Sequence, residues 1–208
     1  VDLAQKSKAY QQAKHTLENA GYTIKEIVLN AAFCGVPQSR KRLFVFGDLQ
    51  SRNGNILDFI QMNLAIKELT VRQYYVDTFG KEPAFDYYYR HPRSYARRAI
   101  FSVDEPSPTI RGVNRPVPST YKLHLGDAFQ DLTKVRPLTT KERAIIQTFP
   151  PNFEFTGNKS EVEQMLGNAV PVKMAEFIAR GFLDYLNGTK VVAKNVHSRA
   201  TTLQPALF

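Results

Sequence analysis

The alternation of hydrophobic and polar positions at the start of the chain predicts a helix followed by two strands. Over residues 4–20, alanine and leucine recur at helical spacing among lysine and glutamine, and Gly21 follows as a stop signal. Residues 22–30 alternate loosely between apolar and polar side chains, which is typical of a strand. The uninterrupted apolar run over 43–47 predicts a buried strand. Residues 1–48 therefore predict a piece of an α/β sheet.

The middle of the chain has a different pattern. Residues 74–122 are rich in tyrosine, arginine and proline and have little helical periodicity, so we predict short strands and long loops there. Helical periodicity then returns, and Thr139 or Thr140 is the expected cap of a helix over 141–148. Two stretches of α/β character thus flank a region of different composition, which favours one domain interrupted by an inserted one.

Two more helices are predicted near the end of the chain. Residues 162–166 predict a short helix and residues 171–186 a longer one, with Pro171 near its first turn and Gly188 beyond its end. Residues 189–208 are weakly patterned, which indicates a loosely held tail.

Composition narrows the class of partner. Lys plus Arg number 28 and Asp plus Glu number 19, which gives a formal charge of +9. This excess favours a polyanionic partner, although many basic proteins bind none. Hydrophobic residues make up 43% of the chain, enough for a folded core, and no run approaches the ~18 apolar residues of a membrane span. With one cysteine and no run that resembles a signal peptide, we expect a cytoplasmic protein without a membrane segment or a disulfide.

A basic motif precedes the second predicted strand. Residues 35–42 have the sequence Gly-Val-Pro-Gln-Ser-Arg-Lys-Arg. Arg40 and Arg42 alternate, so in extended backbone they would share one face at the end of a sheet, where sites of α/β domains are often built. Solvation of a strand end by basic residues is the alternative interpretation.

Two further motifs lie in the last third of the chain. Residues 136–143 have the sequence Arg-Pro-Leu-Thr-Thr-Lys-Glu-Arg and lead to Gln-Thr-Phe-Pro at 147–150, which by itself is an ordinary capped helix. Residues 165–172 have the sequence Met-Leu-Gly-Asn-Ala-Val-Pro-Val, which predicts a turn that leads into a helix. The N-terminus of such a helix accepts anionic groups such as carboxylates. Each motif taken alone is a common local pattern.

Together and in this order, the three motifs resemble the C-terminal half of bacterial DNA (cytosine-5) methyltransferases of the restriction–modification type. That family has a Gln-x-Arg-x-Arg motif after a Gly-Val-Pro turn, an Arg-Pro-Leu-Thr helix that ends in Gln-x-Phe-Pro, and a Gly-Asn-Ala-Val-Pro turn. Here the first motif is Gln38, Arg40 and Arg42, the second lies over 136–150, and the third over 167–171. The resemblance extends to about residue 187.

The resemblance implies an α/β fold in which this chain forms the C-terminal part of a Rossmann-like, S-adenosylmethionine-dependent methyltransferase domain. A small target-recognition domain would be inserted into it. Residues 1–48 would belong to the catalytic domain, residues 50–135 to the recognition domain, and residues 136–187 to the return into the catalytic domain. Residues 188–208 would form the tail.

Several motifs of the family do not occur in this chain. They are the Phe-x-Gly-x-Gly cofactor loop, the Pro-Cys nucleophile and the Glu-Asn-Val acid motif of the N-terminal half. Val1 falls where the Val of Glu-Asn-Val would lie, so we expect this chain to follow that motif and to be inactive by itself. Its expected partners are double-stranded DNA and the N-terminal half, in the same chain or as a separate subunit. Cys34 lies in Phe-Cys-Gly, and we expect a small, half-buried side chain and not a nucleophile.

The chemistry of the family implies roles for individual residues. The target cytosine is flipped out of the duplex, and its O2 gains negative charge as a thiolate adds to carbon 6. The resemblance makes Arg42 the candidate for contacting this O2, and Arg40 the candidate for supporting the pocket or binding a neighbouring phosphate. Asn168 and Ala169 would lie near the methionine end of S-adenosylmethionine, whose carboxylate would meet the start of the helix at Pro171.

The predicted recognition region is rich in arginine, and four tyrosines at 87–89 and 95 are interleaved with it. Arginine suits phosphate forks and bidentate pairing with guanine. By resemblance, the Pro-Thr-Ile-Arg-Gly stretch at 108–112 contacts bases or fills the space left by the flipped cytosine. A solvated basic surface is the alternative. His91 and His124 are isolated from other metal-binding residue types in the sequence, so we expect no metal site. The residues that we expect to contact DNA are Arg90, Arg93, Arg97, Arg98, Thr109, Arg111, Arg115 and Arg136.

A second interpretation belongs to a different class of protein. The chain would be a non-catalytic DNA-binding module, or the separately encoded recognition subunit of a split methyltransferase. An upstream gene that encodes the Phe-x-Gly-x-Gly and Pro-Cys motifs would favour the enzyme. An incomplete sheet exposes apolar faces, so we expect the chain to associate with the other half or with itself.

Overall fold

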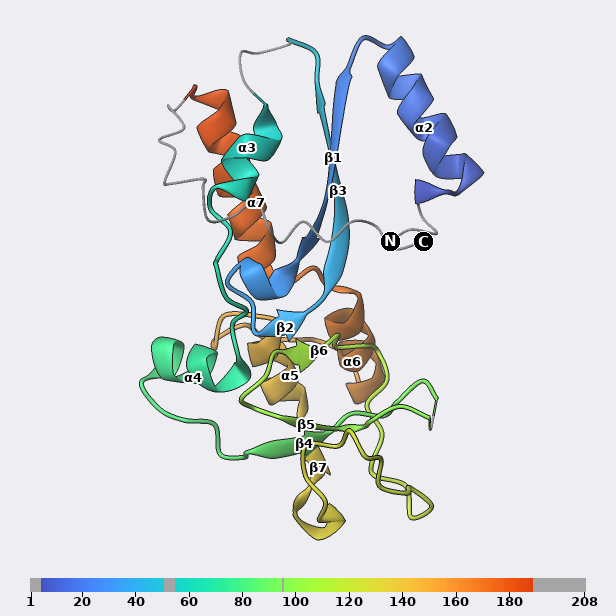
Figure 1. Ribbon diagram of the computed structural model, residues 1–208, viewed down its shortest axis with the longest axis vertical. Helices are drawn as coiled ribbons and strands as arrows, with labels where there is room; N and C mark the ends of the chain where they lie inside the picture. Colours follow the sequence, from blue (N-terminus) through green and yellow to red (C-terminus); the bar gives the residue numbers. More distant parts are fainter. Residues whose placement is uncertain (1–4, 51–54, 95, 189–208) are drawn as a thin grey trace.

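The computed structural model describes residues 5–50, 55–94 and 96–188. Val1, Tyr95 and the expected tail from residue 189 onward lie outside the described residues. Figure 1 shows two lobes stacked along the long axis, with the upper lobe containing β1 and β3 and the lower lobe containing β4, β5 and β7. No helix in the described part of the chain is long and apolar enough to cross a membrane.

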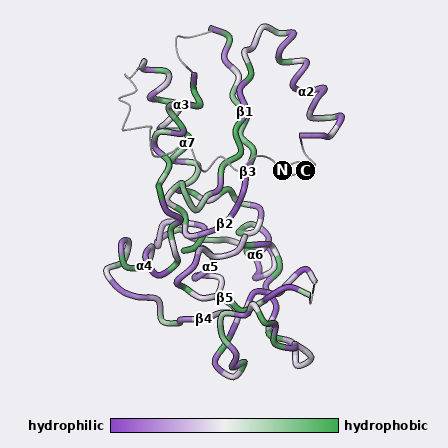
Figure 2. The backbone as a smooth tube through the Cα atoms, in the orientation of Figure 1, coloured by the Kyte–Doolittle hydropathy of each residue, from purple (hydrophilic) through white to green (hydrophobic). Residues whose placement is uncertain are grey.

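The upper lobe is built on an antiparallel pair of strands, β1 (Thr23–Asn30) and β3 (Lys41–Asp48), in register from Thr23 opposite Asp48 to Asn30 opposite Lys41. Helices α3 (Ile56–Gln61) and α7 (Val172–Leu186) pack together and cover one face of this pair. Figure 2 shows hydrophobic positions along both strands and along the two helices that face them. Helix α2 (Lys8–Asn19) lies toward the other face, where Lys14 forms an ion pair with Glu26 at 2.5 Å.

The prediction of a strand over 43–47 is confirmed, but the prediction that this strand is buried is wrong. The strand forms as expected, but no residue of β3 is fully buried in this chain. In the described part of the chain β3 pairs only with β1, so it lacks a second neighbouring strand. On the face toward α2, Val28 is 41% exposed and Val45 is 40% exposed.

The lower lobe contains a small sheet of order β5-β4-β7, in which β4 is central. Helices from the region after residue 136 share its hydrophobic core, which includes Val71, Tyr88, Phe101, Ile146 and Leu166. The elements of this lobe are α4 (Val71–Phe79), β4 (Tyr87–Tyr89), β5 (Ile100–Ser102), β7 (Arg136–Pro137), α5 (Thr140–Ile146) and α6 (Lys159–Asn168). Residues 136–168 therefore pack with residues 71–110, whereas α7 packs with the upper lobe.

The described residues include two helices that the sequence pattern did not predict, α3 and α4. Both are short, and α4 carries tyrosine and β-branched residues that weaken its helical pattern. The signals that were present are their caps, since the side chains of Asn55 and Thr70 accept hydrogen bonds from backbone N–H groups of the first turn. Helix α3 lies inside the range 50–135, yet its core contacts are with β1 and α7.

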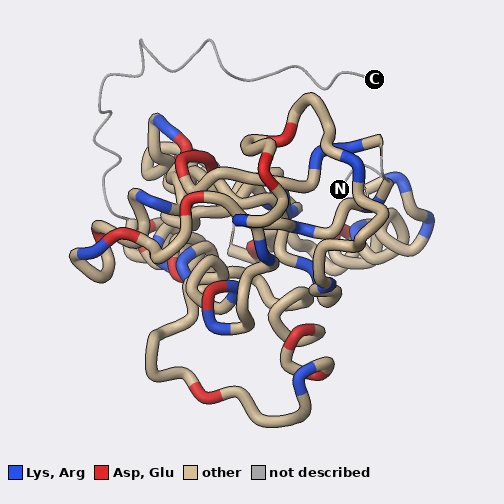
Figure 3. Tube along the Cα trace, turned by 90° about the horizontal axis from the view of Figure 1, so that it is seen from below, with Lys and Arg blue, Asp and Glu red and all other residues tan. Residues whose placement is uncertain are grey.

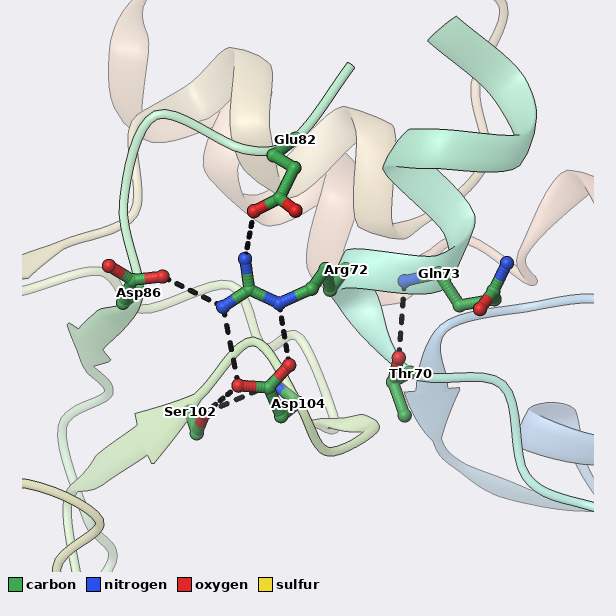
Figure 4. A network of polar contacts seen from close by, with 7 residues as sticks. All are labelled: Thr70, Arg72, Gln73, Glu82, Asp86, Ser102 and Asp104. Atoms are coloured by element: carbon green, nitrogen blue, oxygen red, sulfur yellow. Dashed lines mark hydrogen bonds and ion pairs between the residues drawn. The ribbon is translucent and has the colours of Figure 1, made fainter. Parts of the chain in front are cut away.

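Figure 4 shows how α4 is attached to the rest of the lower lobe through Arg72. The guanidinium forms an ion pair with Glu82, a second with Asp86 at 2.8 Å, and a third with Asp104 at 2.6 Å. Hydrogen bonds from Arg72 and Ser102 lower the pKa of the Asp104 carboxyl, against an opposing effect of desolvation. The three carboxylates come from beyond α4 and from beyond β5, so one side chain joins three segments.

Helix boundaries near the C-terminus follow their capping residues. Thr139 caps α5, and its side chain and that of Glu142 form a reciprocal capping box. Helix α6 is longer than the predicted 162–166, because it begins after a second capping box formed by Asn158 and Glu161. Residues 167–168, predicted as a turn, are therefore the last residues of α6, and the turn itself follows them.

A three-motif hub and an arginine cluster as a candidate DNA interface

The three sequence motifs meet between the two lobes. Gln38 lies in β2 (Gln38–Ser39), which pairs with β6 (Ser107–Pro108), and its side chain is fully buried. Its Nε2 donates to Oε1 of Gln147 at 3.0 Å, and its Oε1 accepts from the N–H of Ile110 at 3.1 Å. Gln147 Nε2 in turn donates to the carbonyl of Leu166. These buried amides, which we call the amide network, join the three motifs although they lie far apart in the sequence.

Arg40 reinforces the same junction. Its guanidinium donates from Nη1 to the carbonyl of Ile110 at 3.0 Å and from Nη2 to the carbonyl of Gly167 at 3.1 Å. The residue is only 2% exposed. Burial, together with the charge of Arg42, lowers the pKa of Arg40 to about 10, so it stays charged at neutral pH. The guanidinium of Arg40 is thus buried and bonded to carbonyls of two distant segments.

Arg42 has a different environment, although the alternating pattern placed it on one face with Arg40. It lies on β3 opposite Leu29, is half-buried, and its Nη1 donates to the carbonyl of Lys41 at 2.7 Å. Burial lowers its pKa. Within the described residues no carboxylate forms an ion pair with it. Arg42 thus differs from Arg40 in its surroundings, with one hydrogen bond to a neighbouring carbonyl in place of two to distant segments.

Gly167 and Gly112 allow the backbone of the third motif to approach that of the 108–112 stretch closely. A Cβ added at Gly167 would lie 2.0 Å from the backbone nitrogen of Gly112 and 2.5 Å from the carbonyl carbon of Arg111. Glycine is therefore required where the end of α6 contacts the Thr-Ile-Arg-Gly stretch. The contact holds Asn168, which is exposed, and Ala169, which is half-buried, at the edge of the hub. Together with Glu161, Gln164 and Met165 they line a hollow on the surface.

The expected carboxylate site at the start of the last helix is not supported by the geometry of α7. Its first free N–H groups are already bonded, that of Val172 to the carbonyl of Gln147 at 3.1 Å and that of Lys173 to Oγ1 of Thr148 at 2.8 Å. Thr148 reaches this position in the left-handed backbone region, with a φ of 60°. The helix N-terminus thus docks onto the end of α5, and the polar side chains of the hollow are those of Glu161, Gln164 and Asn168.

Five arginines of the recognition region form a cluster without carboxylate partners, which we call the cationic cluster: Arg90, Arg93, Arg97, Arg111 and Arg115. Burial and the charges of its neighbours lower the pKa of Arg90 to about 10. Burial and the charge of Arg93 lower the pKa of Arg111. Within the described residues none of the five takes part in an ion pair. Such mutual repulsion is relieved by a polyanion.

Two arginines predicted to contact DNA form ion pairs with carboxylates of the same chain at the surface. Arg98 forms an ion pair with Glu105, and its guanidinium lies 4.3 Å from the centroid of the Phe101 ring. Arg136 pairs with Glu142 through two hydrogen bonds of 2.8 and 2.7 Å. Seen from below the lower lobe, the trace carries basic and acidic positions side by side (Figure 3). Ion pairing therefore decides which arginines offer free charge.

The backbone around Thr109 is held by polar contacts from several directions. Thr109 donates from Oγ1 to the carbonyl of Ser39 at 3.0 Å, and its own carbonyl accepts from Nη2 of Arg90 at 3.1 Å. The guanidinium of Arg111 donates to the carbonyl of His91. Burial, followed by the charges of Arg115, Arg111 and Arg90, lowers the pKa of His91, so its ring is neutral at pH 7.

The sequence analysis did not single out Arg143 or Glu163, which form a buried ion pair between α5 and α6. Arg143 also donates to the carbonyl of Arg111, and Glu163 accepts from Oγ1 of Thr140 at 2.7 Å. The available signal was an arginine among the apolar positions of a predicted helix, beside Ala144. This pair fixes the backbone that carries part of the cationic cluster.

Cys34 is buried, more deeply than the half-buried side chain that the sequence analysis expected. Burial raises the pKa of its thiol to about 12, so the thiolate needed for nucleophilic attack is not populated at neutral pH. Among the described residues no group of three His, Cys, Asp or Glu side chains is arranged to hold a metal ion.

The arrangement of strands and helices is that of known methyltransferases. The crystal structure of S. pombe Dnmt2 methyltransferase matches 90% of this chain with a TM-score of 0.57, and the match covers 65% of that protein at 19% identity. The Entamoeba histolytica methyltransferase EhMeth matches 90% of this chain with a TM-score of 0.55, over 60% of its own length and again at 19% identity. These likenesses concern the fold alone.

The chain belongs to the C-5 cytosine-specific DNA methylase family, whose sequence model matches residues 3–183. It is 55% identical over 187 residues to the type II methyltransferase M.HgiDI of Herpetosiphon aurantiacus, a match that covers 90% of this chain. It is 46% identical over 186 residues to the type II methyltransferase M.HindV of Haemophilus influenzae, which covers 89% of this chain. The matches span 59% and 60% of the lengths of these two relatives.

Proposed function

We propose that this chain is the C-terminal, DNA-recognising portion of a type II DNA (cytosine-5) methyltransferase. The observation that carries the proposal is the amide network, in which three motifs distant in sequence converge beside an unpaired cationic cluster. An upstream portion would supply the nucleophile, the acid and the glycine loop for the cofactor. The exposed Val28 and Val45 on a two-stranded sheet support such a partner, because apolar sheet faces are normally covered.

The two lobes would divide catalysis and DNA binding between them. The upper lobe, with β1, β3, α3 and α7, would complete the catalytic α/β domain together with the upstream portion. The lower lobe would hold double-stranded DNA, with the cationic cluster on phosphates or guanine edges. On this division the recognition region begins after α3, and not at residue 50, because α3 packs with the upper lobe.

Arg42 would act on the flipped cytosine. As a thiolate from the upstream portion adds to carbon 6, negative charge grows on O2 of the ring, and a guanidinium that donates hydrogen bonds there stabilises it. Arg40 acts as a positioning residue, because its bonds to Ile110 and Gly167 fix the segment that leads into β3. When bound, S-adenosylmethionine supplies the methyl group. Asn168 and Ala169 fit the edge of its site, since they line an open hollow beside the hub.

The first test is reconstitution with the upstream portion and quantification of 5-methylcytosine in duplex DNA by mass spectrometry. We expect methylation by the pair, and Arg42→Ala to lower kcat about 100-fold with little change in DNA affinity, because its contact strengthens in the transition state. Arg180→Ala is the matched control, since Arg180 is an exposed arginine paired with Glu176 on α7. A pair that binds DNA and cofactor but never methylates would contradict the proposal and favour a binding module.

A further inference from the structure

One loop of the lower lobe presents a fully exposed leucine. Leu125 has no contact that shields it from solvent, and its neighbour Leu123 is 41% exposed. Exposing a large apolar side chain at a loop tip gains nothing for folding, because the hydrophobic effect rewards burial. An exposed leucine alone is ordinary on a protein surface, so its surroundings decide whether it has a use.

The loop that carries Leu125 is held rigidly. The buried carboxylate of Asp127 accepts four hydrogen bonds: from the Tyr121 hydroxyl at 2.7 Å and from the backbone N–H groups of His124, Ala99 and Ile100 at 2.8 to 2.9 Å. Burial raises the pKa of this carboxyl, but the hydrogen bonds outweigh that effect and hold the pKa below its usual value. A charged, fully bonded anchor therefore fixes the direction of the loop tip.

The anchor also places the loop beside the cationic cluster. Two of the four hydrogen bonds go to Ala99 and Ile100, which directly follow Arg97 and Arg98 in the chain. Gly126 packs against the same segment, since a Cβ built on it would lie 3.7 Å from Cβ of Arg98. The apolar tip and Arg97 thus lie on two segments that these contacts join.

We propose that Leu125 makes an apolar contact with the bases of bound DNA. The inference rests on the proposed DNA-binding function of the lower lobe. Arginines beside the loop attract and position the phosphate backbone, while base edges and base faces offer the apolar surface that a leucine can cover. Preorganisation by Asp127 removes the entropic cost of ordering the tip on binding.

The test measures DNA affinity against salt concentration for the protein reconstituted with its upstream portion. The probe is a short duplex carrying the sequence that this protein methylates in a random library. We expect Leu125→Ala to weaken binding roughly ten-fold at every salt concentration, because an apolar contact releases no counterions. Arg97→Ala should instead make the salt dependence shallower by about one unit of slope.

Three further variants keep the inference falsifiable. Ile66→Ala is the matched control, because Ile66 is also a largely exposed apolar residue, 82% exposed, but its loop is bonded to the upper lobe through Ala65 and Phe33. Leu125→Met should retain affinity, and Asp127→Asn should lose it with the slope unchanged. If Leu125→Ala binds like the wild type while Arg97→Ala is impaired, Leu125 has no such role. If neither Arg97→Ala nor any other cluster variant affects binding, the proposed DNA interface itself fails.

Discussion

At the scale of single residues, the hub depends on the absence of a side chain at one position and on a buried amide at another. Gly167 permits two backbones to touch, and Gln38 supplies both a donor and an acceptor inside the protein. A buried polar group without its partners costs about 1–3 kcal/mol, so each amide in the network depends on the others. Arg40 and Arg42 are two positions apart, yet Arg40 is enclosed by carbonyls of distant segments whereas Arg42 is half-buried and bonds to the neighbouring carbonyl of Lys41.

Gly167→Ala should destabilise the protein. Alanine is favoured over glycine in a helix by about 1 kcal/mol, but the new Cβ would meet backbone atoms of Gly112 and Arg111 that no side-chain rotation can move. Overpacking of this kind costs about 1–3 kcal/mol, so we expect a net loss of stability in urea denaturation. Asn168→Ala is the control on the same helix, and it should stay within about 0.5 kcal/mol of the wild type. Equal stability of the two variants would show that the close approach is not required.

At the scale of elements, helices α5 and α6 are joined by charge in the interior. Arg143 and Glu163 are both nearly inaccessible to solvent, whereas the pair Arg180–Glu176 lies on the exposed face of α7. Removing one partner of a buried pair leaves an uncompensated charge, which water does not screen. The same chemical interaction therefore has different consequences in the two helices.

Glu163→Gln should lower the free energy of unfolding by about 3–5 kcal/mol, because it strands the charge of Arg143. Glu176→Gln, the matched surface control, should cost no more than about 1 kcal/mol. The double variant Arg143→Met with Glu163→Leu should recover most of the loss in thermal unfolding. If it recovers none, the hydrogen bond between Thr140 and Glu163, and not the charge pairing, joins the two helices.

Elements were predicted best where local signals agree with the final structure. The capping box at Thr139 and the proline before α7 act on the backbone within one helical turn. Because these signals are local, α5 and α7 could be predicted from the sequence. Helices α3 and α4 did not, because six or nine residues with weak periodicity are stabilised mainly by the partners that they pack against. The burial of β3 also failed, since an apolar run indicates what a strand can bury and not whether neighbours are present.

At the scale of the whole molecule, the amide network joins two lobes that differ in how well their sheets and cores are covered. The lower lobe has a closed core of its own, formed by residues from 71 to 166. The upper lobe has a two-stranded sheet, which is marginally stable in water unless it is covered. Leu183 and Leu186 of α7 add to its exposed apolar surface. The upper lobe is therefore where an upstream portion would bind.

Amide hydrogen exchange should separate the two lobes. In the chain alone we expect fast exchange over β1 and β3 and slow exchange over α5 and α6, because local stability follows the buried apolar contacts of each region. Addition of the upstream portion should slow exchange in the two strands and leave α5 and α6 unchanged. Full protection of β1 and β3 in the monomeric chain alone would show that the upper lobe is already complete.

The sequence by itself determined the family, the order of the three motifs, the presence of helices α2, α5 and α7 and the excess of basic residues. These are properties of local spacing and composition, which every residue carries with it along the chain. Only the tertiary structure decided that Arg40 is enclosed while Arg42 has no ion-pair partner among the described residues, that Arg98 and Arg136 pair with carboxylates, and that the first N–H groups of α7 bond to Gln147 and Thr148 at the end of α5. Each of these depends on which distant carbonyl or carboxylate lies within about 3 Å, and hydrogen bonding falls off too steeply for spacing in sequence to predict it.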